Sequence, residues 1–191
     1  MIDLNPATTR LADLIAAVGE DQLSDPTPCP EFAVGDLLDH LSTFAVAFRE
    51  AADKTVPADA GRPPPASAAD LGDDWRDRLP RELAELAEAW ARPEAWEGMT
   101  RIGGMDTPGE SAGVVALEEA VVHGWDLARA TGQAYDVPDA ESDVVVGFFG
   151  SFPDEARGDA FGFPEAVPDG AKSLDRAVAQ AGRDPAWSAT P

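Results

Sequence analysis

Apolar residues recur at every third or fourth position over most of the chain, and this spacing predicts α-helices rather than strands. In the stretch 33–52, for example, Leu37, Leu41 and Phe44 would share one face of a helix. Pro6 suits the first position of an N-terminal helix, because its missing N–H is not needed there. The helices predicted in this way cover residues 6–18, 33–52, 70–91, 110–130, 139–150 and 171–181.

Proline and glycine mark where the helical pattern breaks. Residues 24–32 contain three prolines and predict an ordered, extended turn, whereas the Pro-rich stretch 53–69 predicts a long loop. Pro80 predicts a kink or a restart within the third helix. Residues 94–110 alternate weakly, which leaves a short strand open there. The apolar run 144–149 also fits a buried strand, but the DAESD before it is a good helix start and favours a helix.

Nearly all of the periodic signal is helical and the sequence has no internal repeat, so the predicted class is all-α. The helix lengths suit a four-helix bundle with additional short C-terminal helices. With 191 residues, of which 44% are hydrophobic, we expect a single domain over 1–191. Within it, 53–69 would be the Pro-rich loop and 151–191 a C-terminal extension packed on the bundle.

The strongly acidic composition narrows the possible partners. A formal net charge of −22, from 36 acidic and 14 basic residues, argues against nucleic acid and against an anionic membrane surface, since both require Lys and Arg. The first residues lack the basic and apolar regions of a signal peptide, and no apolar run approaches the length of a membrane span. The single cysteine, Cys29, excludes an internal disulfide. We therefore expect a cytoplasmic protein.

Candidate chemistry is concentrated on the predicted helix 110–130. Glu119 and His123 lie one turn apart on one face, among apolar residues, where unpaired charge is costly. His40, the only other histidine, lies on the helix 33–52, which would line the same core. Bundles commonly build metal sites from inward side chains on facing helices. A set of two histidines and one carboxylate would suit Zn²⁺, Fe²⁺ or Ni²⁺ and leave positions open for water or substrate.

The spacing alone is not specific, because Glu-x-x-x-His occurs by chance in many helices as a solvated pair. Asp36 and Asp126 are candidates to hold a ligand imidazole from outside the ligand set. In the alternative interpretation, Asp36 only caps its helix and Asp126 faces water. We interpret Cys29 as a small buried residue of the proline turn rather than as a redox or ligand thiol, because nothing nearby in sequence would lower its pKa.

Three segments resemble the DinB-like metal-binding bundles, specifically the group related to the N-terminal domain of mycothiol-dependent maleylpyruvate isomerase. The segments are TPCPEFAVGDLLDHL (27–41), LEEAVVHGWDLARATGQ (117–133) and AKSLDRAVAQAGRDPAW (171–187). In that family the metal is held by a histidine of the second helix and a Glu-x-x-x-His pair of a later one. The resemblance therefore implies His40, Glu119 and His123 as the metal ligands.

Two features depart from the family pattern. Phe32 and Ala33 stand where the family usually has Trp and then Thr as the helix cap, so the cap must come from elsewhere. The full isomerase also carries a C-terminal domain for which 191 residues leave no room. Its thiol-binding and substrate-binding residues are therefore not assigned to any position of this sequence.

The resemblance implies a metal- and thiol-dependent transferase or isomerase. Such an enzyme would use zinc, nickel or iron together with a low-molecular-weight thiol such as mycothiol, and would act on an electrophilic small molecule. The alternative is a non-catalytic metal-binding bundle that dimerises or binds a partner, and a third is a bundle whose histidines hold no metal. A positively charged pocket for an anionic thiol would separate these hypotheses, but the 14 basic residues are scattered along the chain. No catalytic residue is assigned.

Overall fold

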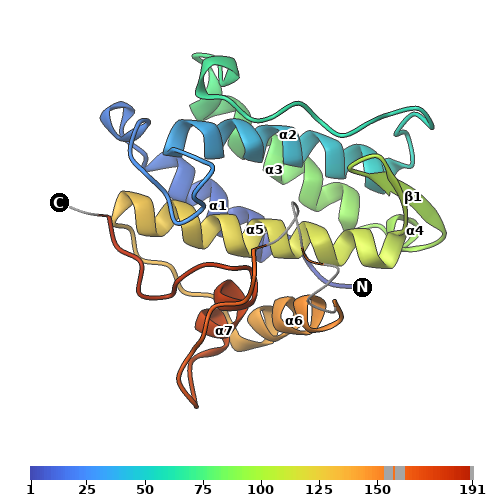
Figure 1. Ribbon diagram of the computed structural model, residues 1–191. Coiled ribbons are helices and arrows are strands. Elements are labelled where there is room, and N and C mark those ends of the chain that lie inside the picture. The colour runs from blue at the N-terminus through green and yellow to red at the C-terminus, as the bar shows by residue number, and fades with distance from the viewer. Residues whose placement is uncertain (153–156, 158–161, 190–191) are drawn as a thin grey trace.

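The computed structural model describes residues 1–152, 157 and 162–189, which form an almost entirely helical protein (Figure 1). Its α-helices are α1 (Asn5–Ala16), α2 (Val34–Asp53), α3 (Trp75–Trp90), α4 (Pro93–Trp96), α5 (Gly109–Thr131), α6 (Asp139–Gly150) and α7 (Ser173–Gln180). Two 3₁₀ turns (Glu20–Gln22 and Ala68–Asp70) and two strands, β1 (Met99–Ile102) and β2 (Met105–Pro108), complete the described elements. The predicted all-α class is confirmed. None of the described helices is long and apolar enough to cross a membrane.

Four helices build the bundle, as predicted. The helices α1 and α2 each pack against both α3 and α5, which closes a ring of four around one core. Burying each large apolar side chain in this core contributes about 1.5–3 kcal/mol. The largest fully buried side chains of the four helices are Leu11, Ile15, Leu37, Leu38, Leu41, Leu79, Leu83, Leu86, Trp90, Leu117 and Leu127.

The helix α5 lies between two layers of the protein. In Figure 1, α2 lies above α5, and α6 and α7 lie below it, where they contact each other and α5. Every residue of α5 from 120 to 128 is buried, as expected for a helix that is covered on all sides. Gly124 allows close approach on this helix, because the Tyr135 phenol occupies the place of a Cβ there and donates to the Val121 carbonyl at 3.2 Å.

Ala33, at the N-cap position of α2, has no side chain that can cap the helix, so the cap comes from other groups. The turn 24–32 brings the Asp25 carbonyl to the Val34 N–H at 3.0 Å. Asp36 reaches back to accept the Ala33 N–H at 3.0 Å. These bonds satisfy N–H groups that have no partner inside the helix. The cap that Ala33 cannot supply thus comes from the turn and from Asp36.

The helix α3 differs from its prediction at its start and at Pro80. It begins at Trp75 rather than at residue 70, because Gly72 adopts a left-handed φ of +74° that interrupts helical geometry. It then continues through Pro80 as one helix instead of restarting. Its apolar face, including the fully buried Leu79 and Leu83, is held by the bundle on both sides of the proline. Tertiary packing thus outweighs the local penalty of the missing N–H.

The region after α4 forms a β-hairpin, of which the sequence indicated only one short strand. The strands β1 and β2 pair antiparallel, with Ile102 opposite Met105. The two residues between them, Gly103 and Gly104, have φ values of +55° and +83°, which suits a two-residue hairpin turn. The long loop 53–69 is held by several hydrogen bonds, including those from Arg101 Nε to the Ala60 carbonyl and from the Ser67 N–H to Asp39.

Candidate metal centre

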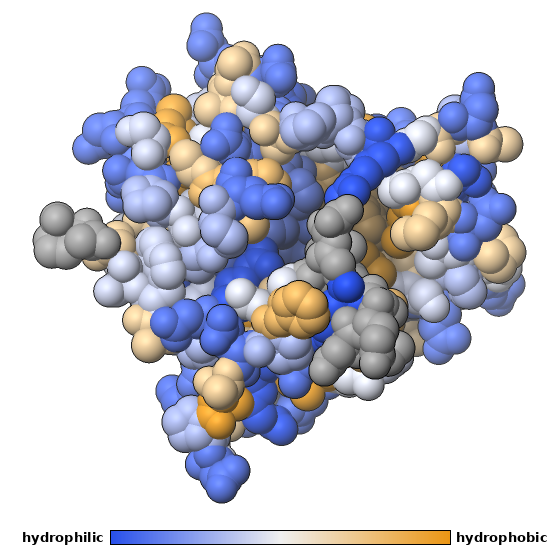
Figure 2. Space-filling model, viewed as in Figure 1, coloured by the Kyte–Doolittle hydropathy of each residue, from blue (hydrophilic) through white to orange (hydrophobic). Residues whose placement is uncertain are grey.

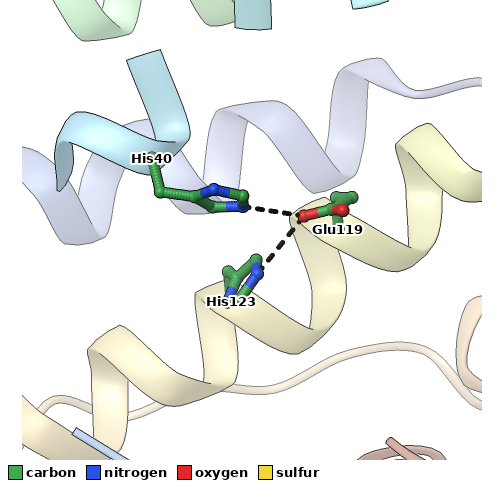
Figure 3. Close-up of side chains that lie close together, drawn as sticks. All are labelled: His40, Glu119 and His123. Carbon is green, nitrogen blue, oxygen red and sulfur yellow. Dashed lines mark hydrogen bonds and ion pairs between the residues drawn. The ribbon is translucent and has the colours of Figure 1, made fainter. Parts of the chain in front are cut away.

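His40 on α2 and Glu119 and His123 on α5 lie together where these two helices pack (Figure 3). Nε2 of His40 is 3.1 Å from Oε2 of Glu119, and Nε2 of His123 is 3.2 Å from the same oxygen. Each residue offers one donor atom, and these atoms all lie within 4.8 Å of one another. The structure therefore brings together the three residues predicted as metal ligands.

The arrangement fits a divalent cation. Imidazole nitrogen and carboxylate oxygen bind Zn²⁺ at about 2.0–2.2 Å, which places two ligand atoms of a tetrahedral ion roughly 3.3 Å apart. The observed separations of 3.1 and 3.2 Å are close to that value. The side chains of His40 and Glu119 are 27% and 23% exposed, against 10% for His123. The site is therefore open to solvent on the side of His40 and Glu119.

The charges of Glu119 and His123 depend on each other. Burial alone would raise the pKa of Glu119, but hydrogen bonds from His123 and His40 outweigh it and hold this pKa far below its ordinary value. Burial alone would lower the pKa of His123, but hydrogen bonds to Asp126 and Glu119 raise it to about 9. In the metal-free chain, a proton on the His123 imidazole thus balances the negative charge of the partly buried Glu119 carboxylate. A bound cation would supply that positive charge instead.

Asp126 orients His123 from behind. Its side chain is completely buried and its Oδ2 accepts from Nδ1 of His123 at 3.0 Å. Arg183 binds the same carboxylate, through Nη2 to Oδ2 at 3.0 Å and through Nε to Oδ1 at 3.4 Å. With a hydrogen held on Nδ1, loss of the other proton leaves the lone pair of Nε2 facing the site, which is the tautomer that a metal ligand requires. Asp126 therefore holds the imidazole of His123, whereas Asp36 caps α2.

The proline turn covers one side of the site with an aromatic ring. The ring centre of Phe32 lies 5.2 Å from that of His40 and 6.2 Å from that of His123. The Thr27 hydroxyl lies within 2.9 Å of the Cys29 and Phe32 carbonyl oxygens and thereby fixes the turn. Cys29 is buried, and burial raises the pKa of its thiol. An inert thiol of this kind agrees with the structural role that we predicted for Cys29.

Two residues beside the site were not predicted. Glu118 is buried, and burial together with the charge of Glu119 raises its pKa to about 8. The sequence gives one signal for Glu118, which is that it directly precedes Glu119 in an apolar stretch. Adjacent helix residues point in different directions, so only one of these two carboxylates can face the metal centre. Arg183 is signalled only by its place after the helix stop Gly182.

A four-helix bundle that gathers two histidines and a carboxylate between two of its helices is the arrangement expected of the DinB-like bundles. The family comparison agrees with this class. The chain belongs to the family of the mycothiol maleylpyruvate isomerase N-terminal domain, whose model matches residues 4–128. The match includes all three clustered side chains, and the predicted relation to that domain is confirmed.

Two similar proteins are the uncharacterized protein MT0763 of Mycobacterium tuberculosis (strain CDC 1551 / Oshkosh) and the uncharacterized protein Rv0738 of Mycobacterium tuberculosis (strain ATCC 25618 / H37Rv). Each is 30% identical to this chain over 134 residues, which are 69% of this chain and 66% of the relative.

The fold is also similar to the crystal structures of the mycothiol-dependent maleylpyruvate isomerase and of a mutant of it, with TM-scores of 0.60 and 0.58. Each match covers 76% of this chain and 65% of the isomerase chain at 15% sequence identity, a level at which the likeness establishes the fold alone. The matches therefore leave about a third of the curated relatives and of the isomerase without a counterpart in this chain.

Proposed function

We propose that this protein binds one divalent transition-metal ion through His40, Glu119 and His123 and serves a thiol-dependent transfer or isomerisation reaction at that site. The observation that carries the proposal is the convergence of two imidazole nitrogens on one carboxylate oxygen, from helices that are distant in sequence. An imidazole pair and a carboxylate that meet in this way form a ligand set with room for a further ligand.

A divalent cation bound here would lower the pKa of a thiol or water in its remaining position and so supply a nucleophile at neutral pH. The protein's own part is to prepare the site. Asp126 keeps Nε2 of His123 available, and Glu119 contributes the negative charge that attracts the cation. The solvent-facing side at His40 and Glu119 leaves a route for a small thiol, and the Phe32 ring borders the two imidazoles.

Support for the thiol comes from family membership. The solved relative is named as mycothiol-dependent, and a low-molecular-weight thiol of that kind is the cofactor that we propose here, with an electrophilic small molecule as the substrate. The match covers 65% of the isomerase chain. That partial coverage favours, as the second candidate function, a metal-binding module without enzymatic activity.

Metal binding is tested by elemental analysis of protein purified without a chelator, in which we expect about one transition-metal ion per chain. Glu119→Gln removes the charged oxygen ligand and should abolish binding. Glu110→Gln makes the same substitution at an exposed position of the same helix and should leave binding intact. If the unchanged protein held no metal, even after addition of Zn²⁺ or Ni²⁺, the proposal would be wrong.

Thiol chemistry is tested on protein loaded with Co²⁺, whose visible absorption reports its ligands. If the site serves a thiol, mycothiol should change this spectrum at millimolar concentration, and an analogue with a hydroxyl in place of the thiol should not. Glu110→Gln should respond like the unchanged protein. A spectrum that thiols leave unaltered, in protein that binds Co²⁺ normally, would contradict the thiol-dependent reaction and favour the module without enzymatic activity.

A further inference from the structure

We propose that Arg183 is a positioning residue of the metal centre, through which the segment after α7 holds His123 in its metal-binding orientation. This inference rests on the proposed function, because it assigns a role toward the same site. It concerns a residue that lies beyond the segment 4–128 matched by the family model.

The contacts form a chain from the ligand to the C-terminal segment. His123 donates through Nδ1 to Asp126 Oδ2 at 3.0 Å, and Arg183 donates through Nη2 to the same oxygen at 3.0 Å. A second bond joins Arg183 Nε to Oδ1 at 3.4 Å. The Asp126 side chain has no exposure to water, and among the described residues the side chains that donate to it are those of His123 and Arg183, which compensate its buried charge. The imidazole and the guanidinium thus share one carboxylate.

The backbone, rather than a flexible side chain alone, directs Arg183 at this carboxylate. At the end of α7, the Arg183 N–H donates to the Val178 carbonyl and the Gly182 N–H donates to the Ala179 carbonyl, both at 3.0 Å. Gly182 has a φ of +80°, which completes the Schellman arrangement of a helix end. Nη1 of Arg183 then donates to the Ala181 carbonyl at 2.8 Å. The orientation of the guanidinium is therefore set by these bonds as well as by its contact with Asp126.

The position of Asp126 matters to the metal because an imidazole can carry its hydrogen on either nitrogen. Asp126 accepts from Nδ1 and so keeps a hydrogen on that nitrogen, which leaves Nε2 of His123 as the nitrogen that gives up its proton when a metal binds beside Glu119. Without Arg183, Oδ1 of Asp126 would lose its donor while still buried, and the carboxylate could turn away from His123. Loss of a partner that orients a ligand typically lowers metal affinity about 10–100-fold.

A purely structural role would be to fasten α7 to α5, and a matched pair of variants separates the two roles. Arg176, which lies on α7 itself, pairs with Asp143 on α6 at 2.9 Å and, within the described part of the chain, has no hydrogen bond or ion pair with a site residue. We expect Arg183→Met to lower Zn²⁺ affinity about 10–100-fold in competition with a chromogenic chelator, and Arg176→Met to stay within about twofold of the unchanged protein. Thermal unfolding of each metal-free variant measures the structural contribution separately.

A second readout follows the imidazole itself. The chain has two histidines, so nitrogen-15 labelling of histidine gives two sets of ring signals in the Zn²⁺-loaded protein. We expect His123 to keep its hydrogen on Nδ1 in the unchanged protein and in Arg176→Met. In Arg183→Met, the Nδ1 hydrogen should exchange faster with water and its signal should broaden, because the Asp126 acceptor is no longer held in place. A structural fastening of α7 alone would leave the hydrogen bond from Nδ1 to Asp126, and therefore this signal, unchanged.

The outcomes are distinct. Failure of the unchanged protein to bind Zn²⁺ would refute the proposed function, and this inference with it. Normal Zn²⁺ affinity together with an unchanged His123 spectrum in Arg183→Met would refute this inference alone. If Arg183→Met does not fold, Arg183→Lys decides the matter, because it keeps the charge but not the two-pronged contact. We expect it to weaken Zn²⁺ binding at least threefold, and an unaltered affinity would overturn the proposal.

Discussion

Nε2 of His40 lies 3.1 Å from Oε2 of Glu119, although 79 positions separate the two residues along the chain. Among the described residues, no other side-chain hydrogen bond joins α2 to α5, whose contact is otherwise built from apolar side chains. A metal ion bound here would therefore link the two helices at the one polar point between them. Figure 2 shows that the face viewed in Figure 1 is largely hydrophilic, as the acidic composition requires.

Because the ligands come from two helices, metal binding should stabilise the whole bundle. At a free Zn²⁺ concentration of 100 times the dissociation constant, binding adds about 2.7 kcal/mol to the free energy of unfolding. For a chain of this size, that gain corresponds to an increase in Tm of roughly 5–10 °C. Differential scanning calorimetry with and without Zn²⁺ measures the change.

The control for this increase in Tm is the pair Glu119→Gln and Glu110→Gln. The first should show no increase with Zn²⁺, whereas the second should respond like the unchanged protein. The formal net charge of −22 makes nonspecific cation binding to surface carboxylates a real competitor. An equal increase in Glu119→Gln would show that Zn²⁺ stabilises the protein from such surface sites rather than from the metal centre.

The two histidines should differ in what they contribute to the metal-free protein. His123 is buried and donates to Asp126, so His123→Ala leaves a buried acceptor short of a donor and should cost about 1–3 kcal/mol of stability. The side chain of His40 is 27% exposed, and His40→Ala should cost less than about 1 kcal/mol. Both variants should lose Zn²⁺ binding. Urea unfolding without metal gives the comparison, and equal destabilisation by the two would contradict it.

The fold was largely predictable, because helical periodicity dominates the sequence. The helix α6 was predicted at 139–150, and the structure has it at Asp139–Gly150. The start of α3 was predicted too early, since Leu71 fits the apolar pattern but Gly72 breaks the backbone geometry after it. The second strand of the hairpin was missed because strands of four residues carry almost no period. The pair Gly103-Gly104 was the available signal for that turn.

The sequence predicted which three side chains would cluster at the candidate site, but not what surrounds them. A chain with two histidines, one of them a helical turn after a carboxylate, offers few other ligand sets, so His40, Glu119 and His123 followed from residue type and helix face. Arg183 did not, because it meets Asp126 across 57 positions and only after a helix end whose geometry depends on Gly182. Contacts of this kind depend on tertiary packing, which periodicity does not encode.

The first half of α5 packs closely against two tryptophan rings, and this packing can be tested at Gly113. A Cβ on Gly113 would lie 2.5 Å from the Trp96 ring and 2.9 Å from the Trp90 ring, both of which are aromatic side chains held by the fold. Gly113→Ala should therefore destabilise the protein by about 1–3 kcal/mol.

Gly147→Ala is the matched control, because Gly147 is an exposed helical position of α6 with no atom within 4 Å of a Cβ. It should stabilise the protein by about 0.4–1 kcal/mol through helix propensity. Chemical unfolding of both variants measures the difference. A Gly113→Ala variant as stable as Gly147→Ala would mean that α5 is seated less tightly than the structure has it.

Metal affinity should increase with pH, because a proton and the metal compete for His123. Burial lowers the pKa of this imidazole, but hydrogen bonds to Asp126 and Glu119 outweigh it and raise the pKa to about 9 in the metal-free protein. A ligand imidazole must be neutral, so below that pKa each unit of pH should change the affinity roughly tenfold. Zn²⁺ competition between about pH 6.5 and 8.5, corrected for protonation of the chelator, should show this slope. Asp126→Asn removes one of the charges that retain the proton, so its affinity should become constant at a lower pH. An affinity that does not vary over this range would contradict the coupling of His123 to its two carboxylates.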